Sequence, residues 1–193
     1  MIIKPLENKD GTIIEGLLLL EPEIFKDSRG FFYESWNQKK FNNLVGKETK
    51  FVQDNKSFSS KGVLRGLHYQ KNPFAQGKLV SCDFGEIFDV AVDIRKGSPT
   101  FGTWTYAYLT SKNKNQLWIP CGFAHGFLAI TDSVQVSYKT TEYWKKESEI
   151  TILWNDPNLS IDWPISKFNV NTSDKDSSGS ILSKILEENL LWK

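Results

Sequence analysis

The 193-residue chain is short of the residues that build metal centres and disulfide frameworks. It has two cysteines and two histidines, and neither pair has the close spacing of a zinc site or a redox motif. Two cysteines in a chain of this size do not form a disulfide framework, which points to a reducing compartment. We therefore expect a fold stabilised by an apolar core of its own.

The chain also lacks a long apolar run and an excess of charge of either sign. No segment is long and apolar enough to cross a bilayer, and residues 1–5 lack the apolar core of a signal peptide. Lys and Arg number 24 against 23 Asp and Glu, which argues against a nucleic-acid surface or a polybasic membrane anchor. We expect a soluble cytoplasmic protein without nucleic-acid or membrane partners. A single localised anionic ligand is compatible with this balance.

Arginine is scarce, so each arginine is informative. The basic residues include only Arg29, Arg65 and Arg95 as arginines, and arginine is the side chain that binds phosphate or carboxylate oxygens in a bidentate way. Arg95 ends a predicted strand beside the turn 96–99, where we expect a structural ion pair rather than a catalytic role. The positions of the other two bear on the anionic ligand.

Short β-rich runs separated by Gly, Asn, Asp and Pro dominate the chain. In 89–95 and in 103–108, apolar or aromatic side chains alternate with small or polar ones, which predicts half-buried strands. Further strands are predicted at 13–20, 31–36, 64–69, 79–84, 117–119, 126–130, 134–139 and 151–154. So many short strands are typical of a sandwich, a small barrel or a double-sheet roll.

Two segments have helical patterns. Residues 37–45 are followed by a glycine that can end a helix, and residues 181–191 carry their apolar side chains on one stripe. Residues 168–179 are rich in Asn, Ser, Thr and Asp, which predicts a loop before the second helix. We predict one domain over residues 1–193, with a C-terminal loop and helix (168–193) packed outside the barrel.

The two histidines stand in the densest clusters of glycine, aromatic and arginine residues. His68 lies in residues 63–70 and His125 in residues 119–127. A lone histidine in an apolar strand is usually a hydrogen-bonded core residue, so the residues alone leave both interpretations open. Many β-barrels bind metal through an HxH pair, a glutamate and a distant histidine. Two separated histidines do not form that set, so we expect no metal.

Ordered motifs extend from about residue 18 to 176. They are FKDSRGFFYE at 25–34, FVQDN at 51–55, LRGLHYQ at 64–70, QGKL at 76–79, FDVAVDIR at 88–95, IPCGFAHGF at 119–127, WNDP at 154–157, IDWP at 161–164 and SDKD at 173–176. In this order they resemble the dTDP-4-dehydrorhamnose 3,5-epimerase family. The resemblance implies an all-β cupin jelly roll (double-stranded β-helix) with a few short peripheral helices. It also implies a homodimeric isomerase that uses no metal or other cofactor.

The resemblance assigns the general base to His68, paired with Asp176. The substrate is a 4-keto sugar whose C3 and C5 protons lie next to a carbonyl, so a base of near-neutral pKa can remove either one if the enolate is stabilised. The carboxylate would fix the histidine tautomer and stabilise the imidazolium. The same resemblance makes Tyr138 the acid on the opposite face of the ring and Lys78 the partner of the oxyanion.

Each of these residues also has an ordinary structural interpretation. Without the motif, Asp176 is a loop or helix-capping acid and Lys78 is a solvated surface charge. Tyr138 shares its strand phase with Val134 and Val136, so it faces the interior if they do. A buried tyrosine at that phase ordinarily packs in the core with a satisfied hydroxyl.

The resemblance further implies residues that bind the nucleotide sugar. They are Arg29, Glu34, Gln53, Asp54, Asn55, Arg65, His125, Glu149 and Lys175. Trp144 occupies the position where the family has a tyrosine or phenylalanine that stacks on the pyrimidine, and its larger ring bears on the base preference. A second departure is Ile150, where close relatives often have glycine after the glutamate.

The family activity is conversion of dTDP-4-dehydro-6-deoxy-D-glucose to dTDP-4-dehydro-L-rhamnose by epimerisation at C3 and C5, in deoxysugar biosynthesis for surface polysaccharide. One alternative is an epimerase that inverts only one of these carbons of a related nucleotide sugar, and Tyr138 favours protonation at both. Another is a non-catalytic cupin that binds sugars. A metal-dependent cupin oxygenase or isomerase is disfavoured by the histidine count.

Overall fold

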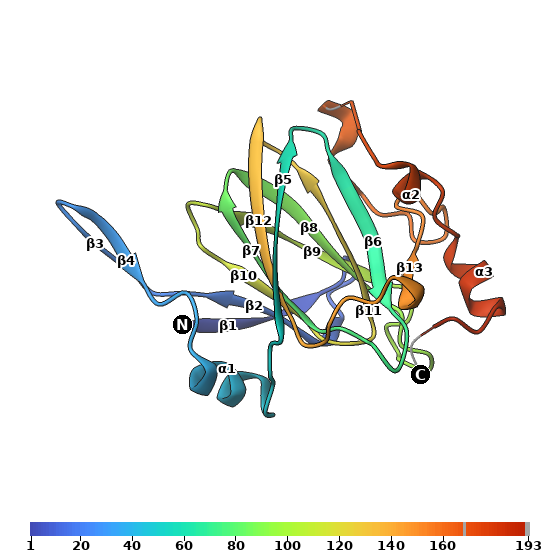
Figure 1. Cartoon of the computed structure of the whole chain (residues 1–193), viewed down its shortest axis with the longest axis horizontal. Coiled ribbons are helices and arrows are strands. Elements are labelled where there is room, and N and C mark those ends of the chain that lie inside the picture. Colours follow the sequence, from blue (N-terminus) through green and yellow to red (C-terminus); the bar gives the residue numbers. More distant parts are fainter. Residues whose placement is uncertain (168, 192–193) are drawn as a thin grey trace.

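The computed structural model of the chain describes residues 1–167 and 169–191, and antiparallel strands make up most of it (Figure 1). The strands are β1 (Ile2–Glu7), β2 (Ile13–Glu21), β3 (Ile24–Asp27), β4 (Gly30–Tyr33), β5 (Gln53–Ser60), β6 (Leu64–Gln70), β7 (Lys78–Phe84), β8 (Glu86–Asp93), β9 (Trp104–Thr110), β10 (Gln116–Ile119), β11 (Phe123–Ala129), β12 (Ser133–Thr140) and β13 (Glu149–Thr151). The helices are α1 (Gln38–Val45), α2 (Asp174–Ser177) and α3 (Leu182–Glu187), with 3₁₀ turns η1 (Lys146–Ser148) and η2 (Ile165–Lys167). The all-β class with short peripheral helices is confirmed.

Two sheets face each other and form a roll. The six-stranded sheet has the order β1-β2-β10-β7-β12-β5, and the five-stranded sheet has the order β13-β6-β11-β8-β9. The paired strands in both sheets run antiparallel. Neighbours such as β2 and β10, or β5 and β12, are far apart in sequence, as expected for the crossing connections of a jelly roll.

Apolar side chains from both sheets fill part of the space between them. Val80 of β7 and Val136 of β12 pack in one buried cluster with Ala91 of β8 and Phe127 of β11. Tyr138 is two residues beyond Val136 on β12 and packs against the same cluster. Because side chains two residues apart share one face of a strand, the inward-facing register predicted for Tyr138 is the one observed.

Strand β8 is buried on both faces, which corrects the prediction that it is half-buried. Its inward-facing side contributes Ala91 to the cluster between the sheets. Val90 and Val92 point the other way and pack with Trp163 and Ile185 of the C-terminal segment. That segment covers the outer face of the sheet, which the alternation of residues could not indicate. Strand β9 is half-buried as predicted, but the side that carries its tyrosines is exposed and the side with Thr105 and Ala107 is buried.

The two predicted helices are present, with different accuracy. Helix α1 matches the pattern of residues 37–45, and the side chain before it accepts a hydrogen bond from the first turn. Helix α3 is shorter than the predicted 181–191, and Asn189 after it has a φ of +54°, a left-handed conformation in which helices end. Residues 168, 192 and 193 of the predicted C-terminal loop and helix lie outside the described residues.

Strands β1, β3 and β5 and helix α2 were not predicted, because each lacks a periodic apolar pattern. Strand β5 reads QDNKSFSS and lies at the edge of the six-stranded sheet, where mostly polar side chains suffice. Helix α2 lies inside the predicted loop 168–179, and its four residues are too few to show a helical period. The strand predicted at 31–36 ends at Tyr33.

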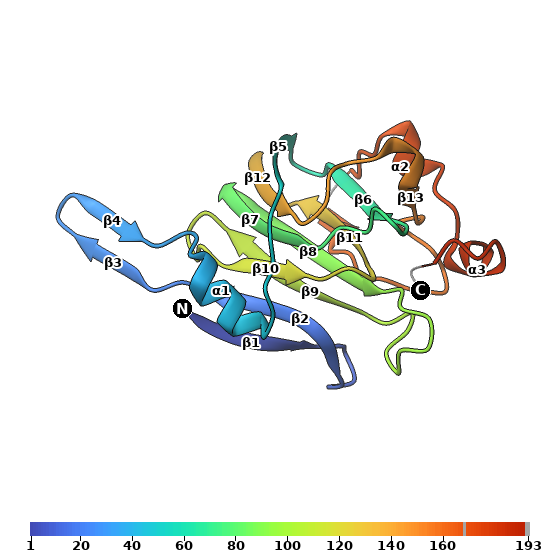
Figure 2. The same ribbon diagram turned by 60° about the horizontal axis from the view of Figure 1, so that its bottom comes forward.

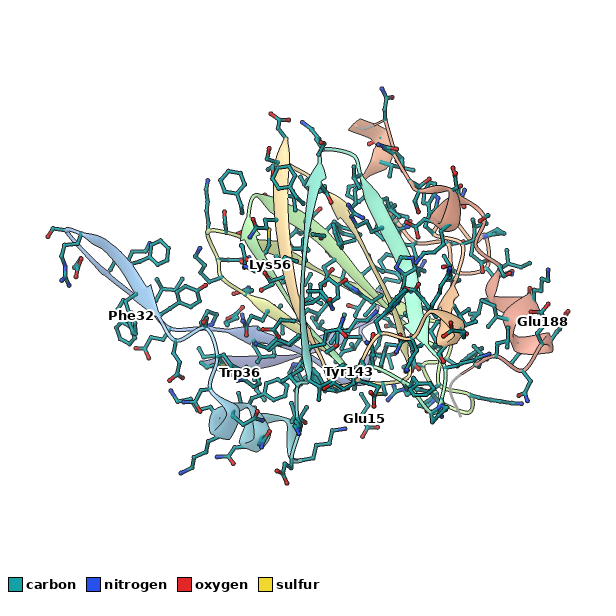
Figure 3. The ribbon with its side chains drawn as sticks, viewed as in Figure 1. Glu15, Phe32, Trp36, Lys56, Tyr143 and Glu188 are labelled. Atoms are coloured by element: carbon teal, nitrogen blue, oxygen red, sulfur yellow. The ribbon has the colours of Figure 1, made fainter. Side chains whose placement is uncertain are left out.

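Strands β3 and β4 form a hairpin that extends away from both sheets (Figure 1 and Figure 2). Its turn carries Arg29 between the two strands. Phe25, Phe31 and Phe32 are all exposed on it, and Figure 3 shows Phe32 on the hairpin, apart from the sheets. Large apolar side chains on a projecting element are typical of a surface that contacts another chain.

The structural ion pair predicted at Arg95 is confirmed. Its Nη2 lies 2.7 Å from Oδ2 of Asp93, which is completely buried. Ser98 and Thr100 donate hydrogen bonds to the same carboxylate oxygen. The pair thus closes the turn after β8.

Over the described ranges, none of the helices has the length and apolar character needed to cross a membrane.

Candidate active site

A cavity of about 510 Å³ opens between the two sheets, where strands β5, β7 and β12 face β6, β11 and β13. Helix α2 and the loop after β12 complete its rim. It is lined by Gln53, Asn55, Ser57, Arg65, His68, Gln76, Lys78, His125, Phe127, Tyr138, Trp144, Glu149, Ser173, Lys175 and Asp176. The four residues predicted to carry the chemistry therefore meet in one cavity.

His68 and Asp176 form a close pair on the wall made by β6 and α2. His68 Nε2 lies 2.5 Å from Asp176 Oδ1, and Ser173 Oγ donates a hydrogen bond to Asp176 Oδ2 at 2.9 Å. Burial lowers the pKa of His68, although the hydrogen bond and charge of Asp176 oppose this shift. Burial also tends to raise the pKa of Asp176, but its bonds to His68 and Ser173 hold it below the usual value. A neutral imidazole backed by a carboxylate can accept a proton at neutral pH.

Helix α2 explains why Asp176 reaches the cavity. Ser173 caps the helix by accepting a hydrogen bond from the Asp176 backbone N–H, as serine commonly does at a helix N-terminus. The cap turns the Asp176 side chain toward β6, where it is buried. The ordinary interpretation of Asp176 as a loop or helix-capping acid is therefore wrong, because Ser173 is the cap and Asp176 is the buried partner of His68.

Lys78 is a buried cation at the start of β7. Its Nζ donates a hydrogen bond of 3.1 Å to the backbone oxygen of His68. Burial lowers its pKa to about 8, while the charges of Glu149 and Asp89 oppose the shift. The ordinary interpretation, a solvated surface charge, is therefore wrong for this lysine. An ammonium group kept from water can stabilise a developing oxyanion strongly.

Tyr138 lies on β12, in the sheet opposite the one that carries His68. Burial raises the pKa of its phenol, and the charge of Glu149 adds to the shift. The hydroxyl is consequently protonated across the neutral range. The cavity therefore has a proton acceptor on one wall and a proton donor on the other.

A second histidine–carboxylate pair lies beside the first. His125 Nε2 is 2.7 Å from Asp89 Oδ1, and Asp89 is completely buried in β8. Strand register places His125 directly opposite His68. Asp89 was not predicted as a site residue. Its signal was an acid at an inward-facing position of a strand otherwise rich in valine, and the expectation of a solvent-exposed face concealed it.

Further predicted ligands also lie on the cavity wall. Arg65 is held by Ser59 and by the backbone oxygen of Phe58. Lys175 Nζ lies 2.9 Å from Glu149 Oε2. Burial tends to raise the pKa of Glu149, but the hydrogen bond from Lys175 and nearby positive charge hold it below its usual value. The isoleucine after Glu149 does not displace this carboxylate from the cavity.

Three predicted ligands do not line this cavity. Arg29 is on the projecting hairpin with 88% of its side chain exposed, paired with Asp27. Glu34 bonds Lys40 on the same side of the molecule. Asp54 pairs with a lysine of β12, because alternate side chains of a strand point to opposite faces and only its two neighbours face inward.

Four lining residues were missed by the sequence analysis. They are Ser57, Gln76, Phe127 and Ser173. Ser57 shares the phase of Gln53 and Asn55 on β5, a strand without an apolar pattern to reveal it. The other three lie within the ordered motifs of the chain, so the motifs marked them without indicating that they face the cavity. Over the described residues, no group of three or more His, Cys, Asp and Glu side chains is arranged to hold a metal ion.

A two-sheet β-roll whose cavity holds a histidine–carboxylate pair, a buried lysine and a tyrosine defines a cupin-type protein with an acid–base site. The family model of dTDP-4-dehydrorhamnose 3,5-epimerase matches residues 11–184. The dTDP-4-dehydrorhamnose 3,5-epimerase of Shigella flexneri is 56% identical over 168 residues, covering 87% of this chain and 92% of that protein. The chain belongs to the dTDP-4-dehydrorhamnose 3,5-epimerase family.

Solved structures agree with this assignment. A dTDP-6-deoxy-D-glucose-3,5-epimerase from Legionella pneumophila, in complex with dTDP-4-keto-L-rhamnose, is 47% identical with a TM-score of 0.90, covering 100% of this chain and 98% of that one. A 3'-monoepimerase from Streptomyces bikiniensis, in complex with dTDP-quinovose, is 32% identical with a TM-score of 0.89, covering 93% and 90%. The predicted cupin fold is confirmed. The same fold also serves an enzyme that inverts one carbon.

Proposed function

We propose that this chain converts dTDP-4-dehydro-6-deoxy-D-glucose to dTDP-4-dehydro-L-rhamnose by inverting C3 and C5. The observation that carries the proposal is the close pair of His68 and Asp176 facing Tyr138 across one cavity. Membership of the epimerase family supports the substrate. The balance of acid and base on opposite walls supports inversion rather than simple binding.

The first half of each inversion is proton removal. His68 takes the proton from the carbon next to the ketone, so the C–H bond breaks and its electrons form an enolate whose negative charge lies on O4. Asp176 stabilises the resulting imidazolium. Lys78 places its ammonium group near O4 and stabilises the enolate. Asp176 occupies Nε2 of the histidine, so Nδ1 is the nitrogen that would accept the proton.

The second half returns a proton from the opposite side. Tyr138 donates its phenolic proton to the same carbon, the ketone re-forms and the configuration is inverted. The imidazolium then loses its proton to water and the phenolate regains one, which restores both groups. Repetition at the other carbon completes the conversion. A raised phenol pKa keeps Tyr138 protonated between turnovers.

The nucleotide would occupy the rim of the cavity. Arg65, His125 and Lys175 bring positive or hydrogen-bonding groups suited to a diphosphate. Trp144 is half exposed at the rim, so its ring face is available to stack on the pyrimidine. Gln53 and Asn55 supply amide groups for the remaining polar atoms.

We propose that the chain acts as a homodimer in which the β3–β4 hairpin reaches the neighbour's cavity. Arg29 and Glu34, assigned to nucleotide binding, lie on or next to this hairpin and away from the cavity of their own chain. The exposed phenylalanines of the hairpin support contact with a second copy. We also propose a cytoplasmic location, which both free cysteines support.

The activity is tested by following the dTDP-4-keto substrate with the purified protein by NMR. Wild type is expected to form the L-rhamno product, whereas His68→Ala is expected to lose at least about 10³-fold in kcat because no other group replaces the base. Lys61→Ala, on the surface, serves as the matched control for handling and folding. Full activity in folded His68→Ala would contradict the mechanism, and an inactive wild type that still binds dTDP would favour a binding protein.

A further inference from the structure

Gln70 is the last residue of strand β6 and of the motif LRGLHYQ, but it is not one of the residues that line the cavity. It is 4% exposed, and its amide group contacts two loops at the rim. Its Nε2 donates to the backbone oxygens of Phe74 at 2.6 Å and Tyr143 at 3.1 Å. Its Oε1 accepts from the backbone N–H of Lys145 at 2.7 Å. Both amide hydrogens and the amide oxygen are thus engaged with backbone.

These bonds bracket Trp144, since one is made to the residue before it and one to the residue after it. The backbone N–H of Trp144 itself donates to Gln53 Oε1 at 3.1 Å. Two glutamines from opposite sheets therefore hold three consecutive residues of the loop. The loop gains little from burial, because Tyr143 is 58% and Trp144 52% exposed, and Figure 3 shows Tyr143 in this loop near the start of β5.

A half-exposed aromatic ring stacks well on a ligand only when its backbone is already held in place, because ordering it at the moment of binding reduces affinity. The position of this loop depends on hydrogen bonds rather than on packing, and Gln70 makes two of them. A buried glutamine with satisfied bonds could serve folding alone. The bonds on both sides of Trp144, the residue proposed to stack on the base, indicate a more specific role.

We propose that Gln70 is a positioning residue that presets Trp144 for binding the nucleotide base. The proposal deepens the proposed function and rests on it for its kinetic test. Gln70 contributes to substrate binding through the loop 141–148 and takes no part in proton transfer. Removing its amide group while keeping its volume should therefore weaken nucleotide binding and leave the chemical step in place.

The test compares Gln70→Met with Asn113→Leu as the matched control. Asn113 also uses its amide group to hold a turn, by bonds to Tyr108, Thr110 and Asn115, but it lies in the loop between β9 and β10, away from the cavity. We expect Gln70→Met to raise KM for the nucleotide sugar about tenfold. Its kcat should stay within about twofold of the wild-type value, and the dependence of kcat on pH should be unchanged. Asn113→Leu should leave KM within about twofold.

A double-mutant cycle identifies the route of the effect. In a Trp144→Ala background, Gln70→Met should change the KM by less than about twofold, because the ring that it positions is gone. An additive effect in the cycle, or a drop in kcat at unchanged KM, would overturn the proposal.

Hydrogen exchange separates this proposal from the proposed function. Gln70→Met should speed amide exchange at Trp144 and Lys145 at least about tenfold relative to wild type without any ligand, because both amides depend on the held loop. Unchanged exchange there would overturn the proposal even if the enzyme were active. If amide exchange were faster in the variant but the wild-type protein proved inactive, the proposed activity would be wrong and the positioning role of Gln70 would still be supported. If Gln70→Met failed to fold, exchange at Trp144 would be measured in Gln70→Glu, which loses the donors to Phe74 and Tyr143 but keeps the acceptor for Lys145.

Discussion

The proposed mechanism gives His68 and Lys78 opposite ionisation requirements, and both residues line the same cavity. In that mechanism the histidine must be neutral to accept a proton, whereas the lysine must be charged to stabilise the oxyanion. Burial disfavours the charged form of each. Activity should therefore be highest in the pH range above the pKa of His68 and below the pKa of Lys78.

Activity is expected to rise with pH through the pKa of His68, at a value below the usual 6.5 of a histidine, because the imidazolium cannot accept a proton. It should fall again above about 8, where Lys78 loses its charge. The measurement is kcat/KM against pH for wild type and Lys78→Arg, because kcat/KM reports the ionisation of groups in the free enzyme. Since arginine stays charged, any activity that this variant retains should lack the alkaline fall. If the activity of Lys78→Arg decreased at the same alkaline pH as that of wild type, a group other than Lys78 would be responsible for the decrease.

The sequence predicted the position of a site residue well where a motif and the alternation of side chains along a strand agreed. Tyr138 is the example, because its phase with two valines predicted the inner face on which it lies. Asp54 shows the limit, since its motif suggested a ligand while strand alternation turns it outward. Asp89 was missed because burial of β8 on both faces depends on the C-terminal segment, which is distant in sequence.

At the scale of elements, β6 and β11 approach each other closely beneath the cavity. A Cβ atom added to Gly66 would lie 2.5 Å from Cα of Gly126 and 2.7 Å from the backbone oxygen of His125. Gly66 also has a φ of +120°, which side chains rarely adopt. Because both positions are glycine, the backbones of β6 and β11 can approach this closely. In this arrangement His68 lies opposite His125.

Gly66→Ala is expected to destabilise the protein by more than about 2 kcal/mol, because backbone atoms rather than flexible side chains must move to admit the methyl group. Gly11→Ala is the matched control. Gly11 also has a positive φ of +79°, but nothing lies within 4 Å of the added Cβ. Urea unfolding of both variants measures the difference. An equal loss of stability in the two would show that backbone strain, and not the strand contact, is responsible.

Elements with a periodic apolar pattern were predictable, and those without one were not. Helix α1 and strands β6, β7 and β12 were expected near their observed positions. Strand β5 carries three of the lining residues on a polar edge sequence, so only its motif drew attention to it. Helix α2 brings Asp176 to His68 with a single turn, which no periodicity analysis detects.

In the whole molecule, the β3–β4 hairpin projects away from the two sheets (Figure 2), and neither Arg29 in its turn nor Glu34 directly after it lines the cavity of its own chain. If a second copy receives them, each site is built from two chains. Co-refolded Arg29→Ala and His68→Ala chains, each with little activity alone, should then regain activity. A random mixture should reach about a quarter of the wild-type value, because half the dimers contain one intact site. No recovery in mixed dimers would place Arg29 in its own chain's site.

We infer that the groups of this cavity exchange protons at both carbons flanking the ketone. The most direct measurement is incubation of the purified protein with dTDP-4-dehydro-6-deoxy-D-glucose in deuterated water, with deuterium at C3 and C5 followed by NMR. We expect incorporation at both carbons by wild type, and at neither by His68→Ala. Incorporation at C3 alone would make the chain a monoepimerase, and incorporation at neither carbon by wild type would show that the proposed proton transfers do not occur.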